Sequence, residues 1–366
     1  MHQVYAGSPD QFEVLSSYDD IYEFCLNQGW TDGLPIVPPT PERVQATLAW
    51  TDRDEHEVVG CIPPQNGEAS VGKIAINAVM AGCSPEYFPV LITAVEALTD
   101  QSFNLDGVQT TTGPLAPLLL INGPVAQELG INGSTMAFGP GWRGNATIGR
   151  AIRLLLVNVG GARPGVLCHS TQGQPGMFSL CAAENEARSP WEPFHVEHAC
   201  KPAESTVSVF AVMPGHHLYQ GHTADDAIVG IAREIGGITH KLINGGEGVL
   251  ALCPEHAHIF ATEGYSKQMV KEAIWEQAGS ALSRLTPSAQ KLARARREHL
   301  FNEGHGEDSW IPIFDRSEQL HIIVVGGDSL HSTFYNCFSQ SQCVVRRIAN
   351  RQGRAVSSVS ELRRPS

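Results

Sequence analysis

A dense group of potentially catalytic side chains lies between residues 181 and 197. Cys181 is a potential nucleophile, and carboxylates, an asparagine and a histidine that could transfer protons follow it closely. A thiol becomes nucleophilic when a histidine or a helix dipole lowers its pKa. Alternatively, the cysteine packs in the core and the glutamates mark a solvated helix end. The density of reactive types favours catalysis, and the expected catalytic residues are Cys181, Glu184, Glu186 and His195.

A glycine-rich loop at residues 139–145 could bind an anion. It leads directly into a predicted helix, so its backbone N–H groups and the side chain of Arg143 could hold a carboxylate or a phosphate. The alternative is a tight loop with a surface arginine. The loop matches neither the Walker nor the dinucleotide fingerprint, so no nucleotide cofactor is predicted. The expected substrate-binding residues are Asn104, Gln109, Trp142, Arg143 and Asn145.

Histidines form a rival centre that could bind a metal ion. The chain has no close HExxH-type motif and no CxxC pair, so this signal is weak and most histidines are expected at the surface or at helix caps. The cofactor is therefore unknown, with a metal as one option. The metal-binding candidates are His216, His217, His222 and His256.

The surrounding pattern predicts the elements that must position these residues. Helices with apolar residues at i, i+3 and i+4 alternate with short apolar strands, which is typical of an α/β fold. We expect a mixed sheet with helices on its faces and glycine-rich loops that approach a ligand. The expected helices cover residues 17–28, 41 onward, 70–81, 85–98, 145–159, 223–235, 254 onward, 266–277 and 289–299, and the strands cover 115–121, 205–213, 249–253 and 320–325.

Charge and composition exclude several classes of protein. The net charge is −13, and the first 100 residues carry 15 acidic and three basic side chains, so a broad nucleic-acid-binding face is not expected. No apolar run approaches the ~20 residues of a membrane span, and residues 1–10 do not resemble a signal peptide. Nine widely spaced cysteines then indicate reduced thiols in a cytoplasmic protein.

The charge distribution predicts three parts. Residues 1–100 form an acidic, mainly helical part, and residues 101–345 form an α/β body that could divide near residues 202–205. Residues 346–366 form a basic tail with six arginines and one glutamate. This tail is either solvated or docked on the acidic N-terminal part of the same or a neighbouring subunit.

Several long motifs resemble one protein family. They are WTDGLPIVPPT at 30–40, KIAINAVMAGCSPEY at 73–87, FNLDGVQ at 103–109, FGPGWRGNATIGR at 138–150, AENE at 183–186 and SPWEP at 189–193. The chain resembles a bacterial and fungal family in which some members are associated with a small partner protein carrying a (seleno)cysteine-Gly-Ser-Cys motif. That motif is absent here, and no catalytic residue is carried over from the family.

Three functions follow from these observations. The first is an enzyme, a lyase, hydrolase or group transferase, acting on a small carboxylated or acylated metabolite through a cysteine and acid–base groups. The second is a metal-dependent lyase or hydrolase with a histidine site. The third is a non-catalytic subunit of a thiol-redox complex, with a small thiol or selenol partner. The chain could also form a homo-oligomer, and neither nucleic acid nor a membrane is an expected partner.

Overall fold

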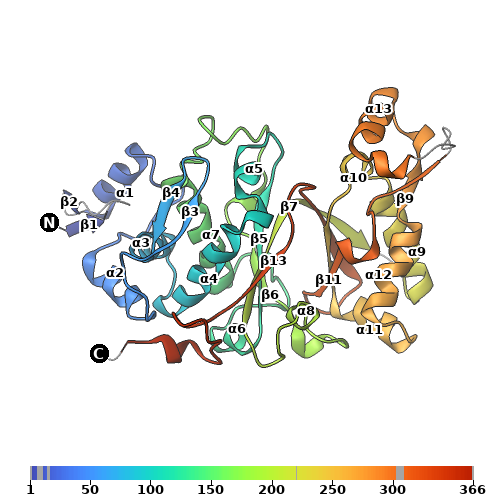
Figure 1. The fold of residues 1–366 in the computed structure, drawn as a ribbon. Coiled ribbons are helices and arrows are strands. Elements are labelled where there is room, and N and C mark those ends of the chain that lie inside the picture. The colour runs from blue at the N-terminus through green and yellow to red at the C-terminus, as the bar shows by residue number, and fades with distance from the viewer. Residues whose placement is uncertain (1, 6–10, 15–16, 220, 302–308, 365–366) are drawn as a thin grey trace. The chain divides into compact units, whose positions relative to one another are not determined.

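The computed structural model describes residues 2–5, 11–14, 17–219, 221–301 and 309–364, and its ribbon is shown in Figure 1. By their contacts the residues form two compact units. Unit 1 comprises Met1–Glu184, His195–Ala211 and Cys343–Ser366, and unit 2 comprises Asn185–Phe194 and Val212–Gln342. The three parts expected from the sequence were defined by charge and not by contacts, so that division stays a prediction.

A mixed sheet of seven strands confirms the α/β class. Among the described residues its order is β11-β8-β12-β7-β5-β6, with β13 added beside β7. Parallel pairs (β5 with β6, β8 with β11) and antiparallel pairs (β7 with β12 and β13, β8 with β12) both occur. The strands are β5 Ala116–Asn122, β6 Cys181–Ala183, β7 Thr206–Tyr219, β8 Gly248–Leu252, β11 Leu320–Val324, β12 His331–Cys337 and β13 Val344–Arg347.

Three buried helices form the centre of unit 1: α3 (Val71–Ala81), α4 (Phe88–Leu98) and α7 (Arg143–Asn158) pack against one another. The hydroxyl of Ser70 caps α3 by accepting from the Lys73 backbone N–H, at the start of the helix expected over residues 70–81. Every residue of α4 except Glu96 is buried. Helix α7 also contacts β6, and α4 contacts β13, so these helices join the strands of unit 1 to its core.

The other elements of unit 1 are shorter. A 3-10 turn, Pro85–Tyr87, precedes α4. The remaining helices and strands are β1 His2–Tyr5, β2 Gln11–Val14, α1 Tyr18–Asn27, α2 Pro41–Leu48, β3 Val58–Ile62, β4 Gly67–Ser70, α5 Leu105–Thr110, α6 Pro124–Glu128 and α8 Phe194–Glu197, whose first residue belongs to unit 2.

Unit 2 has its own apolar core. Leu250, Ile322 and Phe334 of its strands lie in one buried cluster with side chains of its helices. Helix α11 packs on β8, and α12 packs on β11 and α9. The remaining elements are α9 Ala224–Gly236, α10 Thr239–Asn244, α11 Pro254–Thr262, α12 Lys267–Gln277, β9 Gly279–Ala281, α13 Pro287–Arg296 and β10 Trp310–Pro312.

The basic C-terminal segment docks on the acidic N-terminal part of the same chain. Arg346 forms an ion pair with Asp100, and the Nε of Arg351 lies 3.4 Å from a Glu57 carboxylate oxygen. Arg364 donates from Nε to the Thr51 carbonyl at 2.8 Å. All of these contacts lie within unit 1. Of the two alternatives for the tail, the contacts therefore favour docking over a solvated tail.

In the described part of the chain, the helices are too short or too polar to cross a membrane.

Candidate functional site

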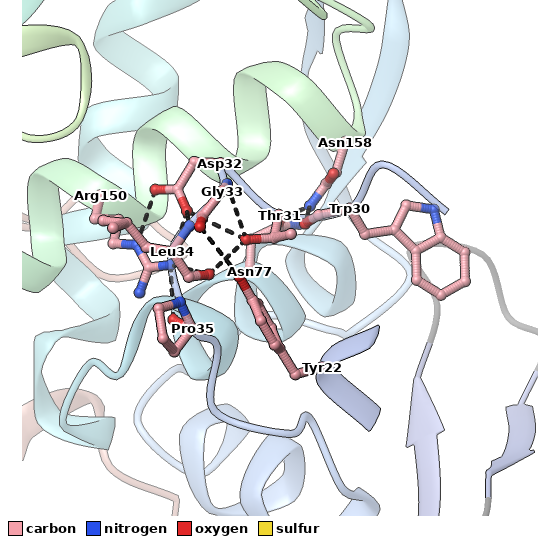
Figure 2. A network of polar contacts seen from close by, with 10 residues as sticks. All are labelled: Tyr22, Trp30, Thr31, Asp32, Gly33, Leu34, Pro35, Asn77, Arg150 and Asn158. Atoms are coloured by element: carbon pink, nitrogen blue, oxygen red, sulfur yellow. Dashed lines mark hydrogen bonds and ion pairs between the residues drawn. The ribbon is translucent and has the colours of Figure 1, made fainter. Parts of the chain in front are cut away.

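The segment at residues 30–35 is fastened to helix α7 by a buried ion pair (Figure 2). The Asp32 carboxylate accepts from Arg150 Nε at 2.9 Å and from Arg150 Nη2 at 2.8 Å. The same Nη2 lies 3.2 Å from the Leu34 carbonyl and 2.9 Å from the Pro35 carbonyl. One guanidinium thus holds both a side chain and the backbone of a segment that has no regular structure.

A second anchor holds the start of the segment two turns further along α7. The Asn158 amide donates to the Trp30 carbonyl at 3.0 Å and to Asn77 Oδ1 at 2.8 Å. Asn77 in turn donates to the Lys73 carbonyl within α3 at 2.9 Å. Figure 2 shows the network that joins this segment to α3 and α7. The start of the segment is therefore anchored to both α3 and α7.

The environment keeps Asp32 ionised. Desolvation raises the pKa of this carboxyl, but hydrogen bonds and the positive charge of Arg150 outweigh it, so the pKa lies below its ordinary value. Only 3% of the Asp32 side chain and 15% of the Arg150 side chain are exposed. The pair is thus electrically neutral and firmly placed.

A pocket of about 780 Å³ lies beside the anchored segment, and all of its lining residues belong to unit 1. Its volume falls within the range of 300–1,000 Å³ that is typical of small-molecule sites. Three stretches of chain line it, namely the segment around Asp32, the second half of α7 and the loop from residue 163 to residue 178. The lining residues are Gly29, Thr31, Asp32, Arg153, Val157, Arg163, Pro164, Gly165, Cys168, Ser170, Thr171, Gln172, Gly173, Gln174, Pro175, Met177 and Phe178.

Two arginines in this lining have no acidic partner among the residues that the structure describes. Arg153 is half-buried on α7, and Arg163 is exposed in the loop that follows the helix. Neither guanidinium has a hydrogen bond or an ion pair with another residue of the described ranges. Since Arg150 neutralises Asp32, the pocket carries two uncompensated positive charges. In a chain with 38 acidic and 25 basic residues, such an arrangement indicates an anion-binding site.

A small second cavity, called the inner cavity below, adjoins the pocket. Its volume is about 20 Å³, and it shares Arg153, Cys168 and Met177 with the pocket. Gln109, which is buried and donates to the Pro63 carbonyl at 3.2 Å, also lines it. The cavity is large enough for one water molecule. Among the predicted substrate-binding residues, Gln109 therefore lines the adjoining cavity and not the pocket itself.

Arg143 has a structural partner in this fold. Its Nε and Nη2 both donate to the carbonyl of Gly82, the C-cap of α3, at 3.1 Å. Trp142 is the N-cap of α7 and is 45% exposed. Neither residue lines the pocket. These contacts favour the alternative in which Arg143 holds the loop, although its partner is a backbone carbonyl.

Asn145 and Asn104 also make structural contacts. Asn145 Oδ1 accepts from the Asn132 N–H at 2.8 Å, and its amide donates to the carbonyls of Asn132 and Ala137. It therefore ties the 132–137 loop to α7. Asn104 has φ of 53° and caps α5 by accepting from the Gly107 N–H. Neither asparagine lines the pocket.

The predicted nucleophile Cys181 lies in a strand, paired with Leu119 of β5. It is 3% exposed, and burial raises the pKa of its thiol. These features favour packing over nucleophilic attack. Glu184 follows the same strand and is buried, and it accepts from the Asn122 amide at 2.5 Å.

His195 and Glu186 are the other two predicted catalytic residues. His195 is fully buried in unit 1, and its Nε2 lies 3.2 Å from the Lys201 carbonyl. Glu186 belongs to unit 2 and begins a 3-10 turn. Neither lines the pocket, and the catalytic roles of all four residues stay predictions.

The four metal-binding candidates are spread over three elements of unit 2. His216 and His217 are exposed on β7, His222 is exposed in a turn, and His256 is buried in α11 within 2.7 Å of Ser332 Oγ. His217 Nε2 lies 2.8 Å from His331 Nδ1. Within the ranges that the structure describes, three or more His, Cys, Asp or Glu side chains do not gather as metal ligands.

The sequence analysis did not single out the residues that line the pocket. Arg153 and Arg163 belong to the charge-poor stretch 101–183, and Cys168 begins the Cys-His-Ser-Thr motif. The usable signal was an excess of arginine over acid there, with four arginines and two acidic residues. It does not tell which arginines are paired, because that depends on Asp32, which is 118 positions from Arg150.

Comparisons with protein-family models, with curated proteins and with solved structures found no match to this chain.

Proposed function

We propose that the chain is an enzyme that acts on a small carboxylated or acylated metabolite bound in the pocket of unit 1. The observation that carries this proposal is the pair of unpartnered guanidiniums, Arg153 and Arg163, in a pocket with apolar walls. A guanidinium binds a carboxylate through two parallel hydrogen bonds, which orients the ligand as well as attracting it. The apolar part of the ligand would contact Val157, Met177 and Phe178.

The reactive thiol that we propose is Cys168, in place of Cys181. Cys168 is also largely buried, at 8% exposed, but unlike Cys181 it lines the pocket, and it lines the inner cavity together with Arg153. The thiolate is the nucleophilic form of a cysteine. The hydroxyls of Ser170 and Thr171 line the same pocket and could orient a carbonyl or leaving group. Hydrolysis, lyase chemistry and group transfer all use such a set of groups.

A pair of alkylating reagents tests the proposal on the intact protein. Iodoacetate carries a carboxylate, whereas iodoacetamide is neutral and of similar size. We expect Cys168 to react faster with iodoacetate, relative to iodoacetamide, than the exposed Cys61 does, because the arginines attract the anion. Arg153→Gln should remove this preference. The measurement is peptide mapping by mass spectrometry after brief labelling.

A charge-matched control separates the pocket from the general field of the protein. Arg354 is exposed and does not line the pocket, so Arg354→Gln removes one positive charge elsewhere in unit 1. This variant should keep the preference of Cys168 for iodoacetate. In the wild-type protein, the ratio of the iodoacetate rate to the iodoacetamide rate is measured at each cysteine. The same ratio at Cys168 and at Cys61 would refute an anion-binding pocket next to the thiol.

We propose a cytoplasmic location for this activity. All nine cysteines are free thiols in the structure. A reducing compartment keeps thiols in this state and would keep Cys168 available for reaction.

A further inference from the structure

We infer that the ligand of the unit 1 pocket is an elongated dianion, with an anionic group at each end and an apolar middle. This inference rests on the proposed function and names its substrate class. It follows from how many charges the pocket leaves uncompensated, and from the different depths at which the two arginines lie.

The charge count favours two anionic groups over one. Asp32 is the acidic residue in the lining, and Arg150 neutralises it with two hydrogen bonds. Arg153 and Arg163 then remain as two positive charges. A monocarboxylate would pair with one of them and leave the other without a partner. A dianion pairs with both, and each such hydrogen bond is charge-assisted.

The two guanidiniums occupy different parts of the pocket. Arg153 is half-buried and lines the inner cavity as well as the pocket. Arg163 is exposed and lines the pocket alone. It lies against the backbone of Gly29, where a β-carbon would come within 3.3 Å of its Nη1. Gly29 has φ of 69°, so this close approach suits the conformation that glycine readily adopts.

The rest of the lining fits a ligand with an apolar middle. In the pocket lining, Val157 is buried, Met177 is half-buried and Phe178 is 49% exposed. The volume of about 780 Å³ is far larger than a single phosphate or carboxylate needs. A short chain with a carboxylate at each end could therefore contact both arginines and cover these apolar groups.

Isothermal titration of the full chain with four probes tests the inference. The probes are glutarate and adipate as dicarboxylates, butyrate as a monocarboxylate, and inorganic phosphate as a compact anion. We expect a dicarboxylate to bind at least about tenfold more tightly than butyrate, the ratio that one charged hydrogen bond supports. Phosphate should bind more weakly than the better dicarboxylate, because it lacks the apolar middle.

Two variants separate the roles of the arginines. Arg163→Gln should lower dicarboxylate affinity to near that of butyrate and leave butyrate almost unchanged, because butyrate is held at Arg153. Arg153→Gln should weaken both dicarboxylates and butyrate by about tenfold or more, since a half-buried charge is less screened by water. Arg354→Gln should change none of these affinities by more than about twofold, because surface charges far from a site are screened.

The outcomes distinguish this inference from the function on which it rests. If butyrate binds as tightly as both dicarboxylates, or if Arg163→Gln has no effect on any probe, the dianion is wrong and the anion pocket stands. If phosphate binds most tightly, the elongated shape is wrong. If none of the four probes binds and Cys168 shows no preference for iodoacetate, the proposed function itself is wrong.

Discussion

Asp32 and Arg150 show how one buried pair can shape a wall of a pocket. Burying two charges costs free energy, which the pair recovers only through good geometry and further hydrogen bonds. Arg150 meets that condition, because it also donates to the carbonyls of Leu34 and Pro35. The pair therefore fixes a segment rich in proline and glycine that has no helix or strand of its own.

Replacing Asp32 should destabilise the protein strongly. Asp32→Asn leaves Arg150 buried without its anionic partner, so the free energy of unfolding should fall by about 3–5 kcal/mol. Chemical denaturation at pH 7 measures this loss. Asp106→Asn is a matched control, because Asp106 is exposed, and it should change stability by less than about 0.5 kcal/mol. Equal effects of both substitutions would contradict a structural role for the pair.

The same pair has a defined pH dependence. The pKa of Asp32 is lower in the folded chain than the ~3.9 expected for an unfolded one. Its contribution to stability is therefore fully present above the unfolded pKa and is lost as the pH falls through the folded pKa. Between pH 5 and pH 2 the wild-type protein should lose more stability than Asp32→Asn does. Denaturation curves across this range check the difference, and parallel losses would argue against it.

The cysteines should differ sharply in reactivity. Burial raises the pKa of Cys83 and of Cys337 to about 12, and it also raises the pKa of Cys181. These thiols should stay protonated and unreactive in the native protein at pH 8. Cys61 is exposed on β3 and should react with iodoacetamide well before them. Quantitative peptide mapping measures the order, and early labelling of Cys181 would restore it as the candidate nucleophile.

At the scale of elements, the C-terminal segment acts as a strap on unit 1. Strand β13 pairs with β7, and the chain then runs to the acidic N-terminal part. Val359 and Leu362 of this segment are 1% and 4% exposed. Exposed ion pairs contribute only about 0–1 kcal/mol each, whereas a buried leucine contributes several times more. Apolar burial therefore holds the segment more than its arginines do.

Two substitutions in the strap separate these contributions. Leu362→Ala should lower the free energy of unfolding by about 2–5 kcal/mol, because it leaves a cavity. Arg351→Gln removes the exposed ion pair with Glu57 and should cost less than about 1 kcal/mol. Denaturation at low and high salt measures both, and only the arginine variant should converge with the wild type in high salt. A larger effect of Arg351→Gln would show that charge holds the strap.

At the scale of the whole molecule, each unit has its own core and its own buried charges. In unit 2, Arg297 is 1% exposed and donates to an Asp315 oxygen at 2.5 Å. Lys241 is fully buried, and its ammonium donates to three backbone carbonyls, those of residues 245, 246 and 247. Desolvation raises the pKa of Asp315, but Arg297 and His299 outweigh it and lower the pKa. These groups stabilise unit 2 through contacts made within that unit.

A substitution in unit 2 should therefore act mainly on unit 2. Asp315→Asn removes the charged partner of Arg297 and should lower the opening free energy of unit 2 by about 1.5–3 kcal/mol. Hydrogen exchange measured by mass spectrometry should show faster exchange in α10, α13 and β10, and unchanged exchange in α3 and α4. Equal acceleration in both sets of peptides would mean that the units open together.

The local signals in the sequence determined the positions of the longer helices and of the strands β5, β8 and β11. Ser17, Thr223 and Ser266 cap α1, α9 and α12 through their hydroxyls, and the expected helices begin at these three residues. Such signals are reliable because a cap bonds within three residues of itself. The prediction for β7 stopped at residue 213, whereas the strand continues to Tyr219, because β12 pairs with its polar second half. Strands β6, β12 and β13 were missed for the same reason, since their partners are distant in sequence.

Only the tertiary structure decided which reactive side chains line the pocket. The sequence predicted an anion site at the 139–145 loop with Arg143, whose guanidinium donates to the carbonyl of Gly82. An arginine is available to a ligand only if no acid or carbonyl in the fold already satisfies it, and those partners come from anywhere in the chain. Likewise, Cys168 and Cys181 are the same chemical group, and the fold alone places one in a pocket and the other in a sheet.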